Sequence, residues 1–401
     1  MTWDAYGVLF DPDEGMDSIN NKINVIIKGE KPKNPYREIL SSKEIQGIKL
    51  RDYGELPVES WLSIYPTEDD LIMLNQANFE AFLDFDGCRE YRNSVRNFVK
   101  DLNRPLMIAI DHCLTGGVIE ELSNRFKEFT LVVFDSHFDG IPSSIRNGLI
   151  GYMIENNSEN KIFGFTPRDY VYNPFGRRNS YNSGSFLYHL VNEGIIKASS
   201  ILVFGVIDYP SEGLSRINDI RVREYVEFYK GMEKEGMRIL SRRIIEHLGP
   251  EEALRRVSSY LSNKIYVSVD LDIGARTALL GSRFINVEGL KEAEIYNSLL
   301  IFYNPRFDII GLDITEIDPW RAGRKYNGIQ DRSYNICGNI VRVLTRGEIY
   351  LDEKYTSLLT KIDRVTIKEL QNKQILNELM KMGFIEQVGK YFKIRYYGKI
   401  V

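Results

Sequence analysis

The sequence predicts an α/β fold built on a parallel sheet that is covered on both faces. Five short runs are rich in Ile, Val and Leu and do not alternate with polar residues, as is typical of buried parallel strands. Amphipathic stretches of helical period separate them, and this repetition of strand and helix indicates βαβ units. The runs are residues 106–110, 129–134, 201–206, 265–269 and 307–312, and the helical stretches are residues 117–126, 186–196, 251–261 and 290–303.

The composition favours a folded protein of the cytoplasm. Of the 401 residues 43% are hydrophobic, enough for a sizeable core, and the formal net charge is -4. Such a mildly acidic chain has no global attraction to nucleic acid or to anionic membranes. The 3 cysteines lack CxxC spacing, which excludes a disulfide framework and favours a reduced protein. We expect no signal peptide and no membrane span, because the amino-terminal segment lacks basic and apolar regions and no apolar run is long enough.

Three segments lie outside this alternation. Residues 1–50 are polar and contain Gly, Pro and Asn, so we expect an irregular lead-in. Residues 215–248 are charged and helical in period, which predicts one long helical segment with a solvated face. From residue 346 a helical pattern is followed by two short strands that predict a hairpin turning near Gly389. Helix plus hairpin resembles a small winged-helix module. The predicted domains are therefore residues 1–345 and a small α+β extension, residues 346–401.

Four of the strands run into acidic residues and histidines. Residues two apart in an extended chain point to the same side, so the members of an Asp-x-His-x-Asp segment can share a face. Ligands of open parallel sheets bind beyond the carboxyl ends of the strands. The chain has 4 His, and two of them fall in these segments. The candidates are Asp111, His112, Asp135, His137, Asp139, Asp270, Asp272, Asp313 and Glu316.

This set of residues predicts a metal site. So many carboxylates in one place would repel one another unless cations lay between them. Carboxylates with one or two imidazoles suit Mn²⁺ or another hard-to-borderline divalent ion. Two ions about 3.5–4 Å apart would use all the acids and could hold a bridging hydroxide. Each segment alone has a simpler explanation, since strand-end acids often cap the next helix. The four segments together favour the metal site.

The same segments resemble the signatures of the ureohydrolase family, which includes arginase, agmatinase and formiminoglutamase. Their order and spacing agree with the family over about residues 45–345. The resemblance implies a three-layer α/β/α parallel sheet of the arginase-like type. The matching segments are Ala109-Ile110-Asp111-His112-Cys113, Asp135 to Asp139, Ser268 to Asp272, and Asp313 to Pro319.

The resemblance also implies a chemistry. It implies a hydrolase that cleaves a C–N bond of a linear amidine or guanidino compound with a hydroxide bridging two Mn²⁺ ions. Glu316 would bind the cationic group of this small-molecule substrate, and a homo-oligomer is the default assembly of the family. The implied ligands are His112, Asp135, Asp139 and Asp270 for one ion and Asp135, His137, Asp270 and Asp272 for the other, with Asp135 and Asp270 bridging.

The chain departs from the family pattern at the proton-transfer position. Arginases and agmatinases have a proton-shuttling His where this chain has Ser183. Proton transfer would then use water, Tyr181 or Ser183. Pro210 stands where arginase has a second acid after the position of Asp208. Substrates like agmatine or formiminoglutamate are therefore favoured over arginine itself.

Two other functions are open at this point. An amide deacetylase of the related fold would use one zinc and paired catalytic histidines, and the chain has no His-His pair. A non-catalytic, metal-binding regulator would act through the C-terminal module; Ser183 favours this alternative, and the complete set of metal ligands opposes it. A nucleic-acid-binding face on the module would favour the regulator, but a solvated hairpin face explains its basic residues better. These residues are Lys390, Lys393, Arg395 and Lys399.

Overall fold

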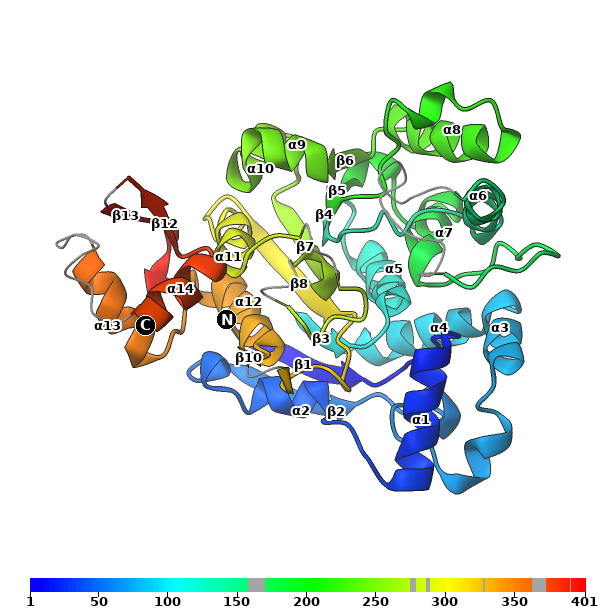
Figure 1. The fold of residues 1–401 in the computed structure, drawn as a ribbon, viewed down its shortest axis with the longest axis horizontal. Coiled ribbons are helices and arrows are strands. Elements are labelled where there is room, and N and C mark those ends of the chain that lie inside the picture. The colour runs from blue at the N-terminus through cyan, green and yellow to red at the C-terminus, as the bar shows by residue number, and fades with distance from the viewer. Residues whose placement is uncertain (158–169, 275–278, 286–288, 327–328, 363–372, 390) are drawn as a thin grey trace.

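The centre of the molecule is an eight-stranded, wholly parallel sheet (Figure 1). The computed structural model describes residues 1–401 except 158–169, 275–278, 286–288, 327–328, 363–372 and 390. The strand order is β2-β1-β3-β8-β7-β4-β5-β6, and the α/β prediction is confirmed. The strands are β1 (Trp3–Val8), β2 (Leu50–Glu55), β3 (Pro105–Ala109), β4 (Thr130–Phe134), β5 (Ile201–Val206), β6 (Arg238–Ser241), β7 (Lys264–Asp270) and β8 (Asp308–Thr315).

Helices cover both faces of this sheet, because alternate side chains of each strand point to opposite sides. In β3, Leu106 and Ile108 belong to one buried apolar cluster, whereas Met107 and Ala109 belong to another. On the Leu106 face lie α2 (Pro35–Leu40), α9 (Arg242–Leu248), α10 (Pro250–Ser258), α11 (Glu292–Leu300) and α12 (Ser333–Arg346). On the Met107 face lie α1 (Met16–Lys28), α3 (Gln76–Asp84), α4 (Gly87–Val99), α5 (Thr115–Arg125), α6 (Ser143–Glu155), α7 (Phe186–Asn192) and α8 (Ile220–Lys234). The three-layer arrangement is therefore confirmed, and none of the described helices is long and apolar enough to cross a membrane.

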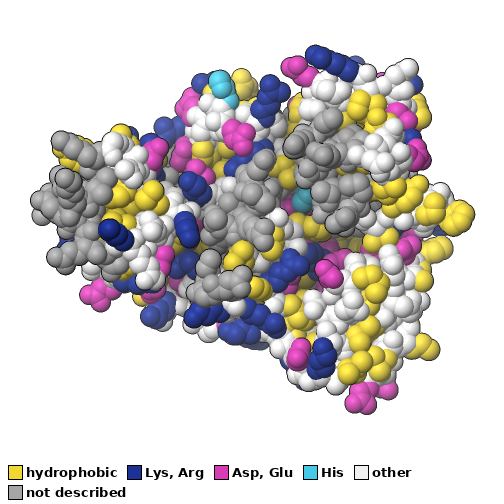
Figure 2. Space-filling model, in the orientation of Figure 1, with side chains coloured by type: hydrophobic (Ala, Val, Ile, Leu, Met, Phe, Trp, Pro, Cys, Tyr) yellow, Lys and Arg dark blue, Asp and Glu magenta, His cyan; other side chains and the backbone are white. Residues whose placement is uncertain are grey.

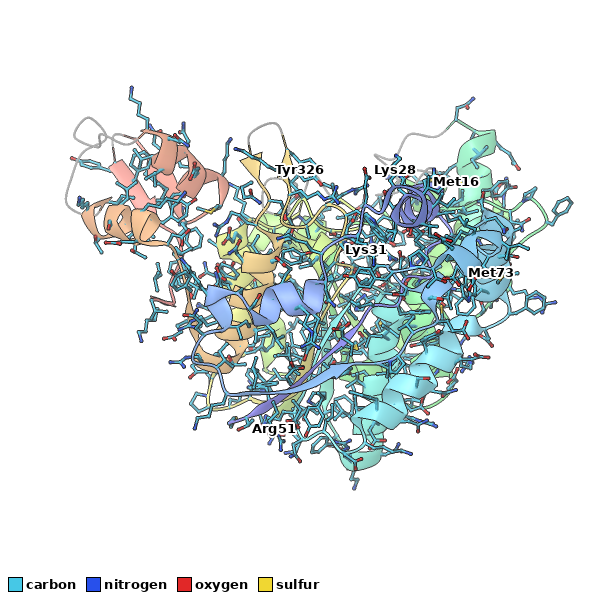
Figure 3. All side chains as sticks on the ribbon, turned by 90° about the horizontal axis from the view of Figure 1, so that it is seen from below. Met16, Lys28, Lys31, Arg51, Met73 and Tyr326 are labelled. Carbon is cyan, nitrogen blue, oxygen red and sulfur yellow. The ribbon has the colours of Figure 1, made fainter. Side chains whose placement is uncertain are left out.

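The expectation of an irregular first 50 residues is wrong. This segment contributes β1, α1 and α2 to the main fold. The Asp4 carboxylate of β1 is fully buried, but it accepts hydrogen bonds from Arg51 Nε at 2.6 Å and from the Asn103 backbone N–H at 2.8 Å. Arg51 lies on the edge strand β2 (Figure 3). The one buried charge of β1 is thus compensated by partners that the sequence pattern of the strand does not show.

The expectation of one helical segment over residues 215–248 is also wrong. The structure divides it into α8, the edge strand β6 and α9. The break falls at Gly236, whose φ of 102° lies in a region that other residues rarely adopt. The charged pattern is therefore that of two helices separated by a four-residue edge strand.

The carboxyl-terminal segment contains the expected helix and hairpin. After α13 (Glu353–Ile362) and α14 (Lys373–Lys381), β12 (Ile385–Val388) pairs antiparallel with β13 (Tyr391–Ile394). The segment packs on the main body: the Ala293 N–H of α11 donates to the Met382 carbonyl at 2.9 Å. In addition, β11 (Glu348–Ile349) pairs in parallel with β14 (Lys399–Ile400). The likeness to a winged-helix module and the domain boundary at residue 346 stay predictions.

Candidate metal centre

Four adjacent central strands bring the candidate residues together at the carboxyl ends of the strands. The strands β3, β8, β7 and β4 are consecutive in the sheet although they are far apart in the sequence (Figure 1). Their carboxyl ends lead into the segments that carry His112, Glu316, Asp270 and Asp135. A parallel sheet places these ends on the same side, which is where ligands of such folds bind.

The first group of possible ligands surrounds His112. Its Nδ1 atom lies 3.0 Å from Asp139 Oδ2, 3.2 Å from Asp135 Oδ2 and 3.3 Å from Asp270 Oδ2. All four side chains are buried, and their ligand atoms are close enough together to hold one ion.

The second group surrounds His137. Its Nδ1 atom lies 2.6 Å from Asp272 Oδ2 and 3.8 Å from Asp135 Oδ1. Asp135, His137 and Asp272 could also hold an ion. Asp135 belongs to both groups, and Asp270 to the first, so a bridging role for Asp270 stays a prediction.

The chemistry of these donors fits divalent cations. Asp135 Oδ2 and Asp272 Oδ2 are buried and face ring nitrogens, His112 Nδ1 at 3.2 Å and His137 Nδ1 at 2.6 Å respectively. When these nitrogens carry no proton, the two carboxylate oxygens lack a partner, which is costly for a buried group. Four carboxylates and two imidazoles are a suitable donor set for Mn²⁺ or a similar ion. The residues present therefore fit the pair of ions that the sequence predicts.

Hydrogen bonds behind His112 fix which ring nitrogen faces the carboxylates. Ser268 Oγ donates to Asp313 Oδ1 at 2.5 Å, and it lies 2.9 Å from His112 Nε2. Because the Ser268 proton is already used, its oxygen accepts the proton of Nε2, and Nδ1 keeps a lone pair for an ion. Asp313 also accepts hydrogen bonds from Thr115 at 2.9 Å and Tyr266 at 2.6 Å. Asp313 thus orients a candidate ligand.

The backbone around the cluster is held in uncommon conformations. Asp139 and Glu316 have φ angles of 50° and 56°, and such positive values in residues other than glycine are most frequent at functional sites. Hydrogen bonds brace the loops: the Ser136 N–H donates to Asp272 Oδ1 at 2.8 Å, and the Asp272 N–H donates to Asp270 Oδ1 at 2.8 Å.

The cluster retains protons when no cation is bound. Burial, followed by the carboxylates of Asp139, Asp270 and Asp272, raises the pKa of Asp135 well above its ordinary value. Burial and the neighbouring Asp272 raise the pKa of Asp270 to about 7. Burial alone would lower the pKa of His112, but hydrogen bonds to the carboxylates outweigh it and raise that pKa. These shifts show how strongly the site favours added positive charge.

A pocket of about 540 Å³ opens beside this cluster and is lined by Ser183 and Glu316 as well as by His137, Asp139 and Asp270. Acidic, basic and histidine side chains gather around a hollow on the corresponding face (Figure 2). Glu316 Oε1 accepts the His112 backbone N–H at 2.9 Å, and Oε2 is buried without a hydrogen bond from the described residues. Tyr181 does not line the pocket, and its hydroxyl donates to the Cys113 carbonyl. Of the two side chains expected as proton carriers, Ser183 is therefore the better placed.

Several pocket residues lie outside the sequence motifs. Arg283 and Phe284 belong to the loop after β7, and the Phe284 ring centre is 5.5 Å from that of His137. Arg146 reaches the pocket from α6, and its Nη2 donates to the Gly184 carbonyl at 2.8 Å. No periodicity or spacing in the sequence marks these positions. Only the fold shows that they lie beside the cluster.

Comparisons with known proteins agree with this architecture. Structures that are similar include arginase from Bacillus subtilis, with 15% identity, a TM-score of 0.52 and coverage of 86% of this chain and 99% of that one. Formimidoylglutamase from the same organism has 13% identity, a TM-score of 0.51 and coverage of 86% of both chains. Formiminoglutamase from Trypanosoma cruzi, solved with Mn²⁺, has 12% identity, a TM-score of 0.51 and coverage of 86% and 92%.

Sequence comparisons give a family. No curated protein matches the chain. The model of the Arginase family matches residues 15–326, which include every candidate ligand and the pocket residues from α1, α6 and the loop after β8. Since this match spans most of the chain, the protein belongs to the Arginase family, whose members are hydrolases acting on C–N bonds.

Proposed function

We propose that the protein is a binuclear-metal hydrolase that cleaves a C–N bond of a linear amidine or guanidino compound, as agmatinases or formiminoglutamases do. One observation carries the proposal: two buried ligand groups share Asp135. Two groups that share a carboxylate would hold two ions side by side, which is the arrangement that two-metal hydrolases need. Manganese is the ion proposed from the donor types.

The side chains would have separate tasks. His112, Asp139 and Asp270 would hold one ion, His137 and Asp272 the other, and Asp135 both. When bound, the two ions would neutralise the carboxylates and make water nucleophilic near neutral pH.

The chain would hold the substrate through Glu316. Its buried Oε2 atom, which lacks a hydrogen bond from the described residues, would bind the amidine or guanidino group in the pocket. Ser183, which lines the same pocket, would carry a proton through its hydroxyl or through an ordered water. By binding the cationic group, Glu316 would fix the orientation of the reacting carbon relative to Asp135 and Asp270.

The alternative is a metal-binding member of the family that does not catalyse and acts through its C-terminal module. The observation that favours it is the hydroxyl side chain of Ser183 at the proton-transfer position, because a serine is a poorer proton carrier near neutral pH than a histidine. The same residues would hold the ions in both cases. The two functions therefore differ in turnover and not in metal content.

The test is product release by Mn²⁺-loaded protein from a panel of guanidino and formimino compounds, with urea and formamide assayed separately. Urea identifies a ureohydrolase, and formamide identifies a formiminoglutamase-like enzyme. The Asp135→Asn variant is the control, because it keeps the shape of the side chain and loses the shared ligand. Absence of both products, with two bound ions per chain, would contradict the proposal and support the regulator.

A further inference from the structure

A positively charged side chain of the protein already lies at Glu316. Arg283 Nε is 3.5 Å from Glu316 Oε2, and Arg283 Nη1 is 3.6 Å from Asp111 Oδ2. Only 12% of the Arg283 side chain is exposed. The guanidinium group of this arginine therefore lies beside the carboxylate that would bind the guanidinium or amidinium group of a substrate.

Further contacts hold Arg283 in this position. Its Nη2 atom donates to Asp11, a carboxylate that is fully buried. Asp11 in turn accepts a hydrogen bond from Ser18 at 2.9 Å and pairs with Lys22, 3.6 Å away. These partners are supplied by α1 and the segment before it.

The backbone of the Arg283 loop is also fixed to the Glu316 loop. The Arg283 N–H donates to the Glu316 carbonyl at 3.1 Å, and Ser282 forms an antiparallel bridge with Ile317. A side chain restrained at its backbone and at its charged end is preorganised. It would have to break several charged contacts to make room for a second cation.

The rest of the pocket contains charges of both signs. Arg146 lines it and forms no ion pair with the residues that the structure describes; its guanidinium lies 4.8 Å from the centre of the Tyr170 ring. Asp13, which precedes α1, and Asp17, in its first turn, also line the pocket. Because acidic and basic side chains both line it, the charge beside the reacting centre contributes to which substrates fit.

We propose that Arg283 is a specificity-determining residue that occupies the cation-binding side of Glu316 and selects substrates whose second charged group is acidic. This inference rests on the proposed function and narrows its substrate class. A substrate whose charged groups are all cationic would have to compete with Arg283 for Glu316. An acidic group on the substrate would instead pair with the Arg283 guanidinium, which presents a planar set of N–H donors to carboxylates.

Two matched ligands test the inference by binding. Agmatine and 5-guanidinopentanoate share a guanidino group and four methylenes, and they end in an ammonium and a carboxylate respectively. Calorimetry on the Mn²⁺-loaded wild type should show tighter binding of the acid. In Arg283→Gln, agmatine should gain roughly ten- to hundredfold in affinity, the range expected when one buried charged contact changes, and the preference should reverse.

Two further variants distinguish the Arg283–Glu316 contact from the effect of removing any positive charge from the pocket. Arg177→Gln removes the same charge from the same pocket, but Arg177 pairs with Glu14 at 2.7 Å and not with Glu316. It should keep the preference for the acid, and Arg283→Lys should keep it in part. Thermal unfolding of each variant shows that it is folded. Wild-type preference for agmatine, or a reversal in Arg177→Gln as large as that in Arg283→Gln, would overturn the inference.

The outcomes of the two tests are distinguishable. If no compound is hydrolysed but the binding preference reverses in Arg283→Gln, the proposed function fails and the role of Arg283 stands. If the wild type hydrolyses agmatine faster than every acidic compound on the panel, the hydrolase is established and the role of Arg283 is refuted.

Discussion

The metal-free protein should lose stability as the pH rises from 5 to 8, and Asp270 should account for a measurable part of this loss. Its carboxyl group is fully buried, and the surroundings raise its pKa from 3.8 to about 7. A group whose pKa is higher in the folded state stabilises that state when protonated. The stabilisation is complete below the unfolded-state pKa and is lost as the pH rises through the folded-state value.

The size of the effect follows from these two pKa values. Between pH 5 and pH 8, the difference in proton binding of this one group lowers the free energy of unfolding by about 2–3 kcal/mol. For a chain of this length, that corresponds to a fall in Tm of about 3 °C. The pKa values of His112 and His137 are also raised, which adds a loss of the same sign above pH 6.5. The pKa of Asp272 is lowered, and its effect therefore falls below pH 4.

The assay is thermal unfolding in a chelator at pH 5, 6, 7 and 8, for the wild type and for Asp270→Asn. The amide keeps the shape of the side chain but does not titrate, so the variant should show a smaller fall in Tm by about the amount above. With saturating Mn²⁺ the wild-type trend should reverse, because the ions bind the deprotonated ligands. A metal-free wild type that is as stable at pH 8 as at pH 5, or an equal fall in the variant, would refute the reasoning.

Three further predictions concern single residues. Asp135→Asn should reduce bound metal from two ions to at most one per chain, because this carboxylate belongs to both ligand groups; unchanged stoichiometry by elemental analysis would contradict its shared role. Ser183→His should raise kcat/KM up to about a hundredfold on a compound that the wild type hydrolyses, since imidazole carries protons near neutral pH; no gain on any such compound would exclude this position as the missing shuttle. Gly205→Ala should destabilise the fold by roughly 2–4 kcal/mol, because Gly205 has a φ of 121° and an added Cβ would lie 2.1 Å from Ile273 and 2.6 Å from the Asp135 carbonyl. An unchanged midpoint in urea would show that the backbone can relax there.

The sequence could predict the centre of the sheet and the ligand cluster for a simple reason. β3, β4, β7 and β8 are buried on both faces and are therefore mostly apolar, and each leads into a chemically distinctive residue. The residues near the sheet edges could not be predicted in this way. β1 contains Asp4 and β6 contains Arg238, so neither strand is an uninterrupted apolar run. Asp4 is stabilised by Arg51, which is distant in the sequence.

The contacts around Arg283 were also beyond reach of the sequence. Asp11 and Arg283 are 272 residues apart, and each lies in a loop without periodicity. A single charged residue in such a loop is usually solvated, and nothing local indicates that this one is buried against Glu316. The same holds for Asp313, which matches a family motif but acts through Ser268 on His112.

The position of β8 determines when the cluster can first exist during synthesis of the chain. β8 lies between β3 and β7 in the sheet. Among the described residues, strand pairing therefore connects β3, which leads to His112, with β7 and β4, which lead to Asp270 and Asp135, only through β8. The His112 N–H and the Glu316 side chain that join across this seam are 204 residues apart. A nascent chain that has emerged only as far as β7 would carry nearly all the candidate ligands in two halves that no described strand pairing joins. It would capture metal tightly only after the last central strand had been inserted, which links cofactor loading to late folding.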